Sequence, residues 1–438
     1  MSYFGTDGIR QSADKFTKEF INSIIAGLAD YSGTDKKVLI GGDTRESSEW
    51  ILQDLAEALE SIGFEYSSVG ILPTPTINYC FYEMGFDFAI DVTASHNPYT
   101  DNGIKIFERG TESGIKLSKS GCVMIDNAIE EHKVINTISA TDRTNLHDEA
   151  IEIYKEHLVA YLGEVNLSGL NIGLDCANGA MSVINKSVFE SLGAKVSLIN
   201  ATANYNQIIN ADCGSTHPEQ LKSLVKENGL DFGIAYDGDG DRCILINNNG
   251  QEIDGDGIIA ILANFLKLDK IVTTVMANQG LLNWATKNHI IAEITPVGDS
   301  NVAEAMRAHN IKIGGEQSGH IILPGEPTGD GMLTSLMIAK VIVESKKPLT
   351  ELASIITKFP QIMVNMSATP EQKENLKTSE NAKKLLLEYD EKLKAVDGRL
   401  LVRPSGTEPL IRITMWGNDE ATINSLASEL KNKMEKTL

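Results

Sequence analysis

The fold class follows from the stretch Lys37-Val38-Leu39-Ile40-Gly41-Gly42-Asp43-Thr44-Arg45, in which a short apolar run ends in a glycine turn. The apolar run predicts a buried strand, and the periodic pattern over residues 48–61 predicts a helix directly after it. Gly63 interrupts that pattern, and a second strand is expected at residues 66–69. A strand, a glycine turn, a helix and a strand in this order predict a β-α-β unit.

This plan occurs two more times along the chain. The strand, helix and strand of these units are expected at residues 171–174, 183–192 and 195–199, and at residues 270–276, 281–287 and 290–294. Each unit again has a glycine or asparagine turn where its first strand meets its helix. Three such units predict three related α/β domains.

The C-terminal part has a different order of elements, which predicts a small α+β domain. Strands are expected at residues 361–367, 399–402 and 410–415, and helices at residues 370–389 and 418–436. The whole chain of 438 residues is long enough for several domains. We expect four of them, with the boundaries 1–148, 149–247, 248–360 and 361–438.

Composition argues against several classes of protein. The formal net charge is −21, so nucleic acid is not an expected partner, because a phosphate backbone requires a basic face. The longest mostly apolar run, residues 257–266, is too short to span a bilayer, and residues 1–10 lack the apolar segment of a signal peptide. The five cysteines have no C-x-x-C spacing, which favours a reducing compartment. We therefore expect a cytoplasmic protein with no membrane partner.

The loop Asp237-Gly238-Asp239-Gly240-Asp241-Arg242 is a candidate metal site that follows a strand expected at residues 232–236. Three carboxylates this close would repel one another without a cation, and their oxygens suit Mg²⁺ or Ca²⁺. An EF-hand is excluded, because Arg242 and Asn248 stand where that motif requires glycine and glutamate. Arg242 is placed to neutralise a transferring phosphoryl group.

The same loop permits an alternative interpretation. A strand followed by Asp-x-Asp also begins the haloacid-dehalogenase type of phosphotransferase, in which the first aspartate, here Asp237, would be the nucleophile. That pattern has Thr or Val at its fifth position, where this chain has Asp241. Phosphate on Asp237 rather than on a serine would distinguish the two interpretations.

The stretch Val92-Thr93-Ala94-Ser95-His96-Asn97-Pro98 places a serine just after a strand expected at residues 86–90. Pro98 prevents a helix from starting here. A serine on such a stiff loop would suit a nucleophile or a phosphate carrier, although the seven residues alone favour an ordinary turn. Because neighbouring side chains alternate in an extended loop, we expect His96 to point away from Ser95.

A candidate phosphate cradle lies between the last two strands, in Arg403-Pro404-Ser405-Gly406-Thr407-Glu408-Pro409. It offers a guanidinium, two hydroxyls and a run of backbone N–H groups, and Arg412 would add a second positive charge. A rigid hairpin loop without a ligand is the alternative interpretation.

Two further groups suit the recognition of a sugar and of its phosphate. Glu316 and Ser318 would lie on one side of an extended segment and bind sugar hydroxyls, and His320 would serve as an acid or base. A glycine-rich turn is the alternative there. Arg10 and Lys105 each follow a glycine-bearing turn and are candidates for steering phosphate, or else they are surface cations.

Together these motifs resemble the α-D-phosphohexomutase family over the whole chain. They occur in the order of that family, at residues 4–10, 93–98, 237–242, 315–320 and 403–409. The resemblance is closest to bacterial members that act on glucosamine phosphates, through Asp101-Asn102-Gly103-Ile104-Lys105, Cys213-Gly214-Ser215-Thr216-His217 and Gln317. It implies an α/β fold of three related domains with mixed sheets and a small TATA-box-binding-protein-like α+β domain, around a central cleft.

The resemblance also implies roles for individual residues. Ser95 would be a phosphoserine and a ligand of Mg²⁺ together with Asp237, Asp239 and Asp241. Proton transfer and charge would be supported by the catalytic residues Arg10, Lys105, Arg242 and His320. The substrate would be bound by Glu316, Ser318, Arg403, Ser405, Gly406, Thr407 and Arg412.

The implied reaction interconverts glucosamine 6-phosphate and glucosamine 1-phosphate through glucosamine 1,6-bisphosphate, and it would supply UDP-N-acetylglucosamine and cell-wall precursors. A phosphomannomutase or phosphoglucomutase of the same family is the alternative, because the sequence gives no firm contact to the group at C2. A phosphosugar sensor without turnover is a third class, which the intact Ser95 and the three aspartates disfavour. The expected partner is a small phosphosugar, and a homodimer is compatible with the resemblance.

Overall fold

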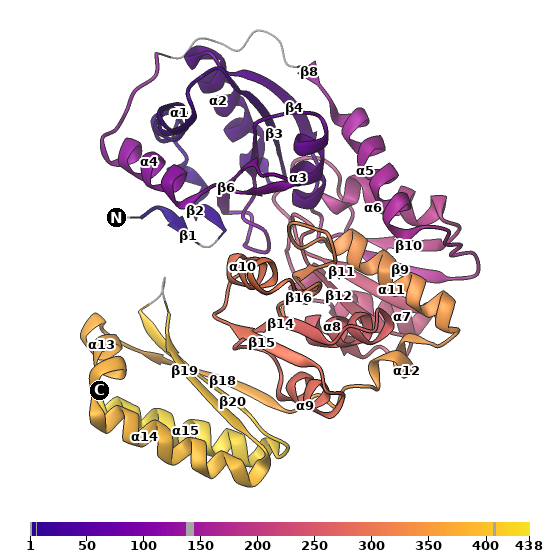
Figure 1. Ribbon diagram of the computed structural model, residues 1–438, viewed down its shortest axis with the longest axis vertical. Coiled ribbons are helices and arrows are strands. Elements are labelled where there is room, and N and C mark those ends of the chain that lie inside the picture. The colour runs from indigo at the N-terminus through magenta and orange to yellow at the C-terminus, as the bar shows by residue number, and fades with distance from the viewer. Residues whose placement is uncertain (1, 6, 137–143, 406–408) are drawn as a thin grey trace.

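The computed structural model describes residues 2–5, 7–136, 144–405 and 409–438. Four β-sheets follow one another along these residues, and helices cover the sheets (Figure 1). The β-α-β units predicted from the sequence are confirmed, because β3 and β4, β9 and β10, and β14 and β15 each pair in parallel. Each of these three sheets also contains antiparallel pairs, so the sheets are mixed as expected.

The first sheet has the order β1-β2-β6-β5-β3-β4-β8, with β7 paired to β6. Its strands are β1 (Phe4–Gly5), β2 (Gly8–Ser12), β3 (Lys37–Gly42), β4 (Glu65–Ile71), β5 (Phe88–Val92), β6 (Asp101–Arg109), β7 (Gly114–Lys116) and β8 (Thr144–Asn145). The helices of this region are α1 (Lys18–Ser32), α2 (Glu46–Ile62), α3 (Thr74–Glu83) and α4 (Lys119–Glu130). The carboxyl end of β5 leads directly into the serine loop, residues 92–98.

The second sheet has the order β10-β9-β11-β12-β13. Its strands are β9 (Asn171–Asp175), β10 (Lys195–Ile199), β11 (Phe232–Tyr236), β12 (Cys243–Asn247) and β13 (Glu252–Ile253), and its helices are α5 (His147–Leu162), α6 (Met181–Ser191) and α7 (Glu219–Asn228). The turn from β11 to β12 carries the aspartate loop, residues 237–242. Because β13 pairs with β12, the second sheet extends past residue 247, while the four expected domain boundaries themselves stay a prediction.

The third sheet has the order β15-β14-β16-β17. Its strands are β14 (Lys270–Thr274), β15 (Ile291–Thr295), β16 (Gly314–Gly315) and β17 (Ile321–Ile322), and its helices are α8 (Gly255–Phe265), α9 (Gln279–Lys287), α10 (Asp299–His309), α11 (Gly331–Ser345) and α12 (Leu349–Ala353). The loop between β16 and β17 contains the predicted sugar-binding residues.

The C-terminal sheet is antiparallel, with the order β18-β20-β19. Its elements are β18 (Gln361–Ser367), α13 (Pro370–Thr378), α14 (Glu380–Leu393), β19 (Arg399–Pro404), β20 (Leu410–Trp416) and α15 (Glu420–Thr437). The single helix expected over residues 370–389 is wrong, because Ser379 is extended and its hydroxyl caps the start of α14. The α+β character of this part is confirmed.

The hydrophobic cores explain how the molecule is divided. One large core joins buried side chains of the first three sheets, from Leu39 to Leu349, and the first sheet has a second core against α1, α2 and α4. The C-terminal sheet packs on its helices around a core that, among the described residues, it shares with no other sheet. Figure 1 shows this last part, in yellow, set beside the other three. Among the helices that the structure describes, none is long and apolar enough to cross a membrane.

Candidate active site

Ser95 stands at the exit of β5, fully buried, with a positive φ of 53°. This left-handed conformation is strained for a residue with a side chain, so the surroundings must hold it. The Ser95 N–H donates to Thr93 Oγ1 at 2.9 Å. Its carbonyl oxygen accepts from Arg45 Nη2 and from Asn210 Nδ2, both at 2.8 Å. The serine loop is therefore held by a contact within the loop and by two contacts from other segments.

Arg45 is one of the residues that sequence reasoning missed. Its guanidinium is fully buried, pairs with Asp43 Oδ2 at 2.9 Å and donates to carbonyl oxygens of the serine loop. Burial raises the pKa of Asp43, and the Arg45 charge offsets part of that rise. The available signal was the charged Asp43-Thr44-Arg45 run at the end of a buried strand, where charged side chains need partners.

The aspartate loop faces the serine. Ser95 Oγ donates to Asp237 Oδ2 at 2.6 Å, and the three loop carboxylates offer oxygens that all lie within 4.8 Å of one another. Gly238 permits this approach, because a Cβ at that position would lie 2.6 Å from the Ser95 carbonyl oxygen. Burial, followed by repulsion from Asp239 and Asp241, raises the pKa of Asp237 well above its usual value. Such a cluster calls for a cation.

Lys105 lies against the aspartate loop from β6. Its ammonium is 2.8 Å from Asp239 Oδ2 and 3.1 Å from Asp241 Oδ2, and the side chain is only 3% exposed. Burial alone would lower the pKa of Lys105, but the surrounding carboxylates outweigh burial and raise that pKa well above its usual value. Lys105 is thus held as an ammonium ion, which supplies positive charge rather than a base.

Arg242 and His96 also lie close to Ser95 and Asp237. Arg242 Nε is 3.8 Å from Asp237 Oδ2, and Arg242 Nη1 is 3.1 Å from His96 Nδ1. The expectation that His96 points away from Ser95 is wrong, because His96 Nδ1 lies 3.4 Å from Ser95 Oγ. The expectation assumed an extended loop, whereas Ser95 is left-handed. Burial and the Arg242 charge lower the pKa of His96 to about 4, so its ring is neutral at neutral pH.

The loop between β16 and β17 is a turn rather than an extended segment, because Gly319 N–H donates to the Glu316 carbonyl oxygen at 3.0 Å. The argument that alternation places Glu316 and Ser318 on one side is therefore wrong. Glu316 Oε1 accepts from the Gly298 N–H at 3.0 Å, and Ser318 is exposed. His320 is buried with its Nδ1 3.6 Å from Asp241 Oδ2, so it joins the aspartate loop.

The predicted phosphate cradle lies at the end of β19 and the start of β20. Arg403 and Arg412 are register partners on these strands, and Ser405 is buried beside them. Burial and the charge of Arg412 lower the pKa of Arg403. Two neighbouring guanidiniums are a feature of sites that bind anions. Gly406 and Thr407, which were assigned to the same cradle, lie outside the described residues.

Models of four domains match the chain in succession. They are described as phosphoglucomutase/phosphomannomutase alpha/beta/alpha domain I at residues 1–134, domain II at 152–250 and domain III at 254–359, and as the C-terminal domain at 339–433. The chain belongs to the phosphoglucomutase/phosphomannomutase family. The resemblance found in the sequence motifs is thereby confirmed, and so is the four-domain fold class.

Relatives of this phosphoglucomutase/phosphomannomutase family member match over its full length. The phosphoglucosamine mutase of Clostridioides difficile is 39% identical over 450 residues, which cover 100% of this chain and 99% of that protein. The phosphoglucosamine mutase of Staphylococcus haemolyticus is 38% identical over 455 residues, with coverage of 100% and 99%. Both carry the name of one activity in the family.

Solved structures share the fold at lower identity. A phosphoglucomutase/phosphomannomutase family protein from Burkholderia thailandensis aligns with a TM-score of 0.76 and 20% identity, over 100% of this chain and 96% of that one. The N-acetylphosphoglucosamine mutase of Aspergillus fumigatus, solved with GlcNAc-6P and magnesium, has a TM-score of 0.66 and 17% identity over 99% and 95% of the two chains. These likenesses support the fold.

The aspartate loop of this family member fits a divalent metal ion. Asp239 Oδ1 and Asp241 Oδ1 are buried and have no hydrogen-bond partner among the described residues. A buried carboxylate oxygen without a partner is costly, and a metal ion would remove that cost. An all-oxygen donor set suits Mg²⁺, which commonly keeps positions open for water or phosphate oxygen.

Proposed function

We propose that the chain is a phosphoglucosamine mutase, which interconverts glucosamine 6-phosphate and glucosamine 1-phosphate. The observation that carries the chemistry is Ser95 Oγ at 2.6 Å from Asp237 Oδ2, inside a buried loop of three carboxylates. The choice of glucosamine rests on full-length relatives of that name at 38–40% identity. This function would supply UDP-N-acetylglucosamine and cell-wall precursors.

The proposed reaction transfers a phosphoryl group twice. The bond from phosphorus to Ser95 Oγ breaks while a bond forms to the free C1 hydroxyl oxygen of glucosamine 6-phosphate, whose proton leaves, and glucosamine 1,6-bisphosphate results. The bisphosphate then turns over in the cleft. Its C6 phosphoryl group passes to Ser95 Oγ, a proton returns to the C6 oxygen, and glucosamine 1-phosphate leaves with Ser95 phosphorylated again.

In this proposal Asp237, Asp239 and Asp241 would hold Mg²⁺ beside the phosphorylated Ser95. When bound there, the ion would supply positive charge that stabilises the phosphoryl group. Arg242 adds a guanidinium beside the same carboxylates. Arg45 and Asn210 keep the serine loop in place. This matters for the reaction rate, because small displacements of reacting atoms lower that rate strongly.

The remaining predicted residues take supporting roles in the proposal. Lys105 stabilises negative charge as an ammonium ion, and His320 is the candidate for proton transfer. Arg10 pairs with Asp7 beside Lys105 and would steer phosphate. Sugar hydroxyls would be bound by Glu316 and Ser318, and the non-reacting phosphate by Arg403, Ser405, Gly406, Thr407 and Arg412.

Enzyme assays with purified protein test the substrate. Glucosamine, glucose and mannose phosphates compete for the enzyme in the presence of Mg²⁺ and a hexose 1,6-bisphosphate primer. We expect the glucosamine phosphate to have the highest kcat/KM. Preference for mannose or glucose phosphate would move the chain to phosphomannomutase or phosphoglucomutase, and binding of all three without turnover would make it a phosphosugar sensor.

The proposal includes a setting for the reaction. Its partner is a small phosphosugar, and we place it in the cytoplasm, where nucleotide sugars are made. A homodimer belongs to the same proposal. Sedimentation of the purified protein measures its mass in solution, and a monomer at micromolar concentration would contradict this part alone.

A further inference from the structure

Six side chains from three sheets form a closed ring of charge next to the aspartate loop. Around the ring, each of the three carboxylates lies between two nitrogen-bearing side chains. We call it the charge ring; in order its members are Asp7, Lys105, Asp241, His320, Asp299 and Lys116.

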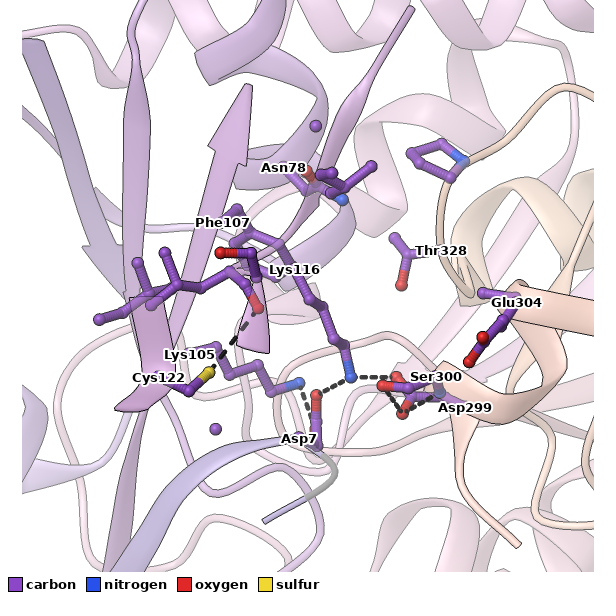
Figure 2. A pocket seen from close by; sticks show the side chains of 18 of the residues that line it. Asp7, Asn78, Lys105, Phe107, Lys116, Cys122, Asp299, Ser300, Glu304 and Thr328 are labelled. Carbon is purple, nitrogen blue, oxygen red and sulfur yellow. Dashed lines mark hydrogen bonds and ion pairs between the residues drawn. The ribbon is translucent and has the colours of Figure 1, made fainter. Parts of the chain in front are cut away.

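Four of the ring contacts are short and two are longer. Lys116 contacts Asp7 Oδ1 at 2.6 Å and also pairs with Asp299, and Lys105 is 3.0 Å from Asp7 Oδ2 and 3.1 Å from Asp241. His320 lies 3.6 Å from Asp241 and 3.9 Å from Asp299. Figure 2 shows Lys116 reaching between Asp7 and Asp299.

The ring borders a cavity of about 430 Å³ between the first and third sheets. Five of its six members line this cavity, and Asp241 belongs to the aspartate loop. Lys116 ends strand β7 and Asp299 begins helix α10, so their ion pair joins these two elements across the cavity. Neither residue was among the predicted site residues, and neither contacts the three loop aspartates in the described ion pairs.

Lys116 controls how the positive charge of Lys105 is shared. Lys105 divides its contacts among Asp239, Asp241 and Asp7. Because Lys116 also neutralises Asp7, Lys105 remains free to lie against the aspartate loop. Asp7 also pairs with Arg10, so the loss of Lys116 would remove one of its three cations. Asp7 would then compete more strongly with Asp239 and Asp241 for Lys105, since opposite charges in a buried site attract strongly. Asp299 would keep only the longer contact with His320.

We propose that Lys116 and Asp299 are positioning residues of the phosphoryl transfer, which hold Lys105 and His320 against the aspartate loop by closing the charge ring. This inference rests on the proposed mutase function. It adds two residues that act through their neighbours, and their ion pair would connect the two sides of the cavity between the first and third sheets.

The test is Lys116→Met, which keeps the aliphatic stem and removes the charge. We expect kcat to fall about 10- to 100-fold, because displacement of a catalytic group by about 1 Å costs about that much, with KM changed by less than about 3-fold. Lys116→Arg should recover a part of kcat, since it restores the positive charge. A merely structural role would lower thermal stability without this separation of kcat from KM.

Lys222→Met is the matched control. Lys222 has a side-chain exposure of 29%, against 28% for Lys116, and it also pairs with two carboxylates, Glu219 and Glu252. It lies on α7, away from the charge ring, so kcat should stay at the wild-type value. An equal loss of kcat in Lys222→Met would contradict the inference.

A second variant keeps the inference testable if Lys116→Met does not fold. Asp299→Asn preserves shape, and we expect a similar fall in kcat. In the double variant the losses should be less than additive, because both substitutions open the same ring. Wild-type kcat in either single variant, or fully additive losses in the double variant, would overturn the inference that the charge ring positions Lys105 and His320. Wild-type turnover is measured first, and its absence would contradict the proposed function instead.

Discussion

We call the serine loop, the aspartate loop and the charge ring together the proposed transfer centre. The proposed transfer centre and the C-terminal sheet differ in how they arrange charged side chains. In the centre, carboxylates alternate with cations, and Lys105 alone contacts three carboxylates, of which Asp239 and Asp241 are buried and Asp7 is partly buried. In the C-terminal sheet, Arg403 and Arg412 stand side by side on paired strands. The centre thus combines carboxylates with cations and fits a metal ion, whereas the C-terminal sheet brings together two guanidiniums, an arrangement that suits an anion such as phosphate.

Their cores differ in the same sense. The centre lies among three sheets that all contribute to one large core, although the first sheet also packs on α1, α2 and α4 around a second one, whereas the C-terminal sheet contributes only to a core of its own. A shared core fixes atoms relative to one another, and a separate core permits a sheet to move as a unit. Under the proposed function, we infer that the centre holds the reacting atoms in fixed positions, and that the C-terminal sheet moves as it binds and releases phosphate.

Ser95→Ala should have the largest effect on this comparison. Removal of the proposed phosphate carrier should lower kcat by about 10⁴-fold or more, because both phosphoryl transfers of the proposed reaction pass through Ser95 Oγ. Affinity for glucosamine 6-phosphate, measured by calorimetry, should stay close to the wild-type value, since the proposed phosphate cradle is untouched. Full mutase activity in this variant would remove Ser95 from the reaction.

Arg45→Met tests whether the centre depends on its buried support. Loss of the guanidinium leaves Asp43 buried without its cation, and breaking such a pair costs about 3–5 kcal/mol of unfolding free energy. We expect kcat to fall about 100-fold, because the serine loop is no longer held. Urea unfolding and steady-state kinetics measure the two effects.

Arg109→Met is the control for that substitution. Arg109 also donates to two carbonyl oxygens, those of Tyr82 and Phe86. It is exposed, and neither of these partners belongs to the serine loop. Its replacement should cost less than about 1 kcal/mol and leave kcat unchanged. Equal losses in the two variants would mean that Arg45 is not special to the centre.

Arg403→Ala tests the other side of the comparison. Loss of a charge-assisted contact to phosphate of about 1.5–3 kcal/mol should raise KM about 10- to 100-fold. Stability should stay level or rise slightly, because the neighbouring charge of Arg412 opposes that of Arg403. Lys392→Ala, on the surface of α14, is the control and should leave KM unchanged. A loss of stability with normal KM would assign Arg403 a structural role.

Asp330→Asn has the smallest expected effect, which is on the pH dependence of stability. It tests a buried carboxyl group that has no lysine beside it. Asp330 caps α11 and accepts from Tyr154 Oη at 2.5 Å, and burial raises its pKa to about 6. The folded state therefore binds more protons than the unfolded state between about pH 4 and pH 6, so the carboxyl loses stability as pH rises through that window.

The variant lacks this titration and keeps a side chain that caps helices well. The stability of wild type minus that of Asp330→Asn should fall by on the order of 1–3 kcal/mol from pH 4 to pH 7. Denaturant unfolding at the two pH values measures it. A difference that does not change with pH would mean that the carboxyl titrates at its ordinary value, and one that grows would mean that its pKa is lowered in the folded state; either would contradict the expectation.

The sequence was sufficient for the β-α-β units, because each glycine turn separates a strand pattern from a helix pattern. It was insufficient for Ser379, since a serine inside a charged helical pattern carries no sign that it will cap a new helix. The Asp237, Asp239 and Asp241 cluster was predictable because its members are close in the chain.

Contacts between distant segments were not predictable. Arg45 reaches the serine loop from a different strand end and donates to the carbonyl oxygen of Ser95, which has a left-handed conformation. The orientation of His96 follows from the same conformation, so it could not be predicted from the sequence either. The ring through Lys116 and Asp299 closes only when three sheets come together.

The most direct test of the central claim locates the phosphoryl group. Purified protein is incubated with glucosamine 1,6-bisphosphate and Mg²⁺, and intact mass and peptide mapping follow, with and without hydroxylamine. We expect one phosphoryl group per chain, on Ser95 and stable to hydroxylamine. A hydroxylamine-labile group on Asp237, as in the haloacid-dehalogenase interpretation, or a Ser95 that never carries phosphate, would contradict the account.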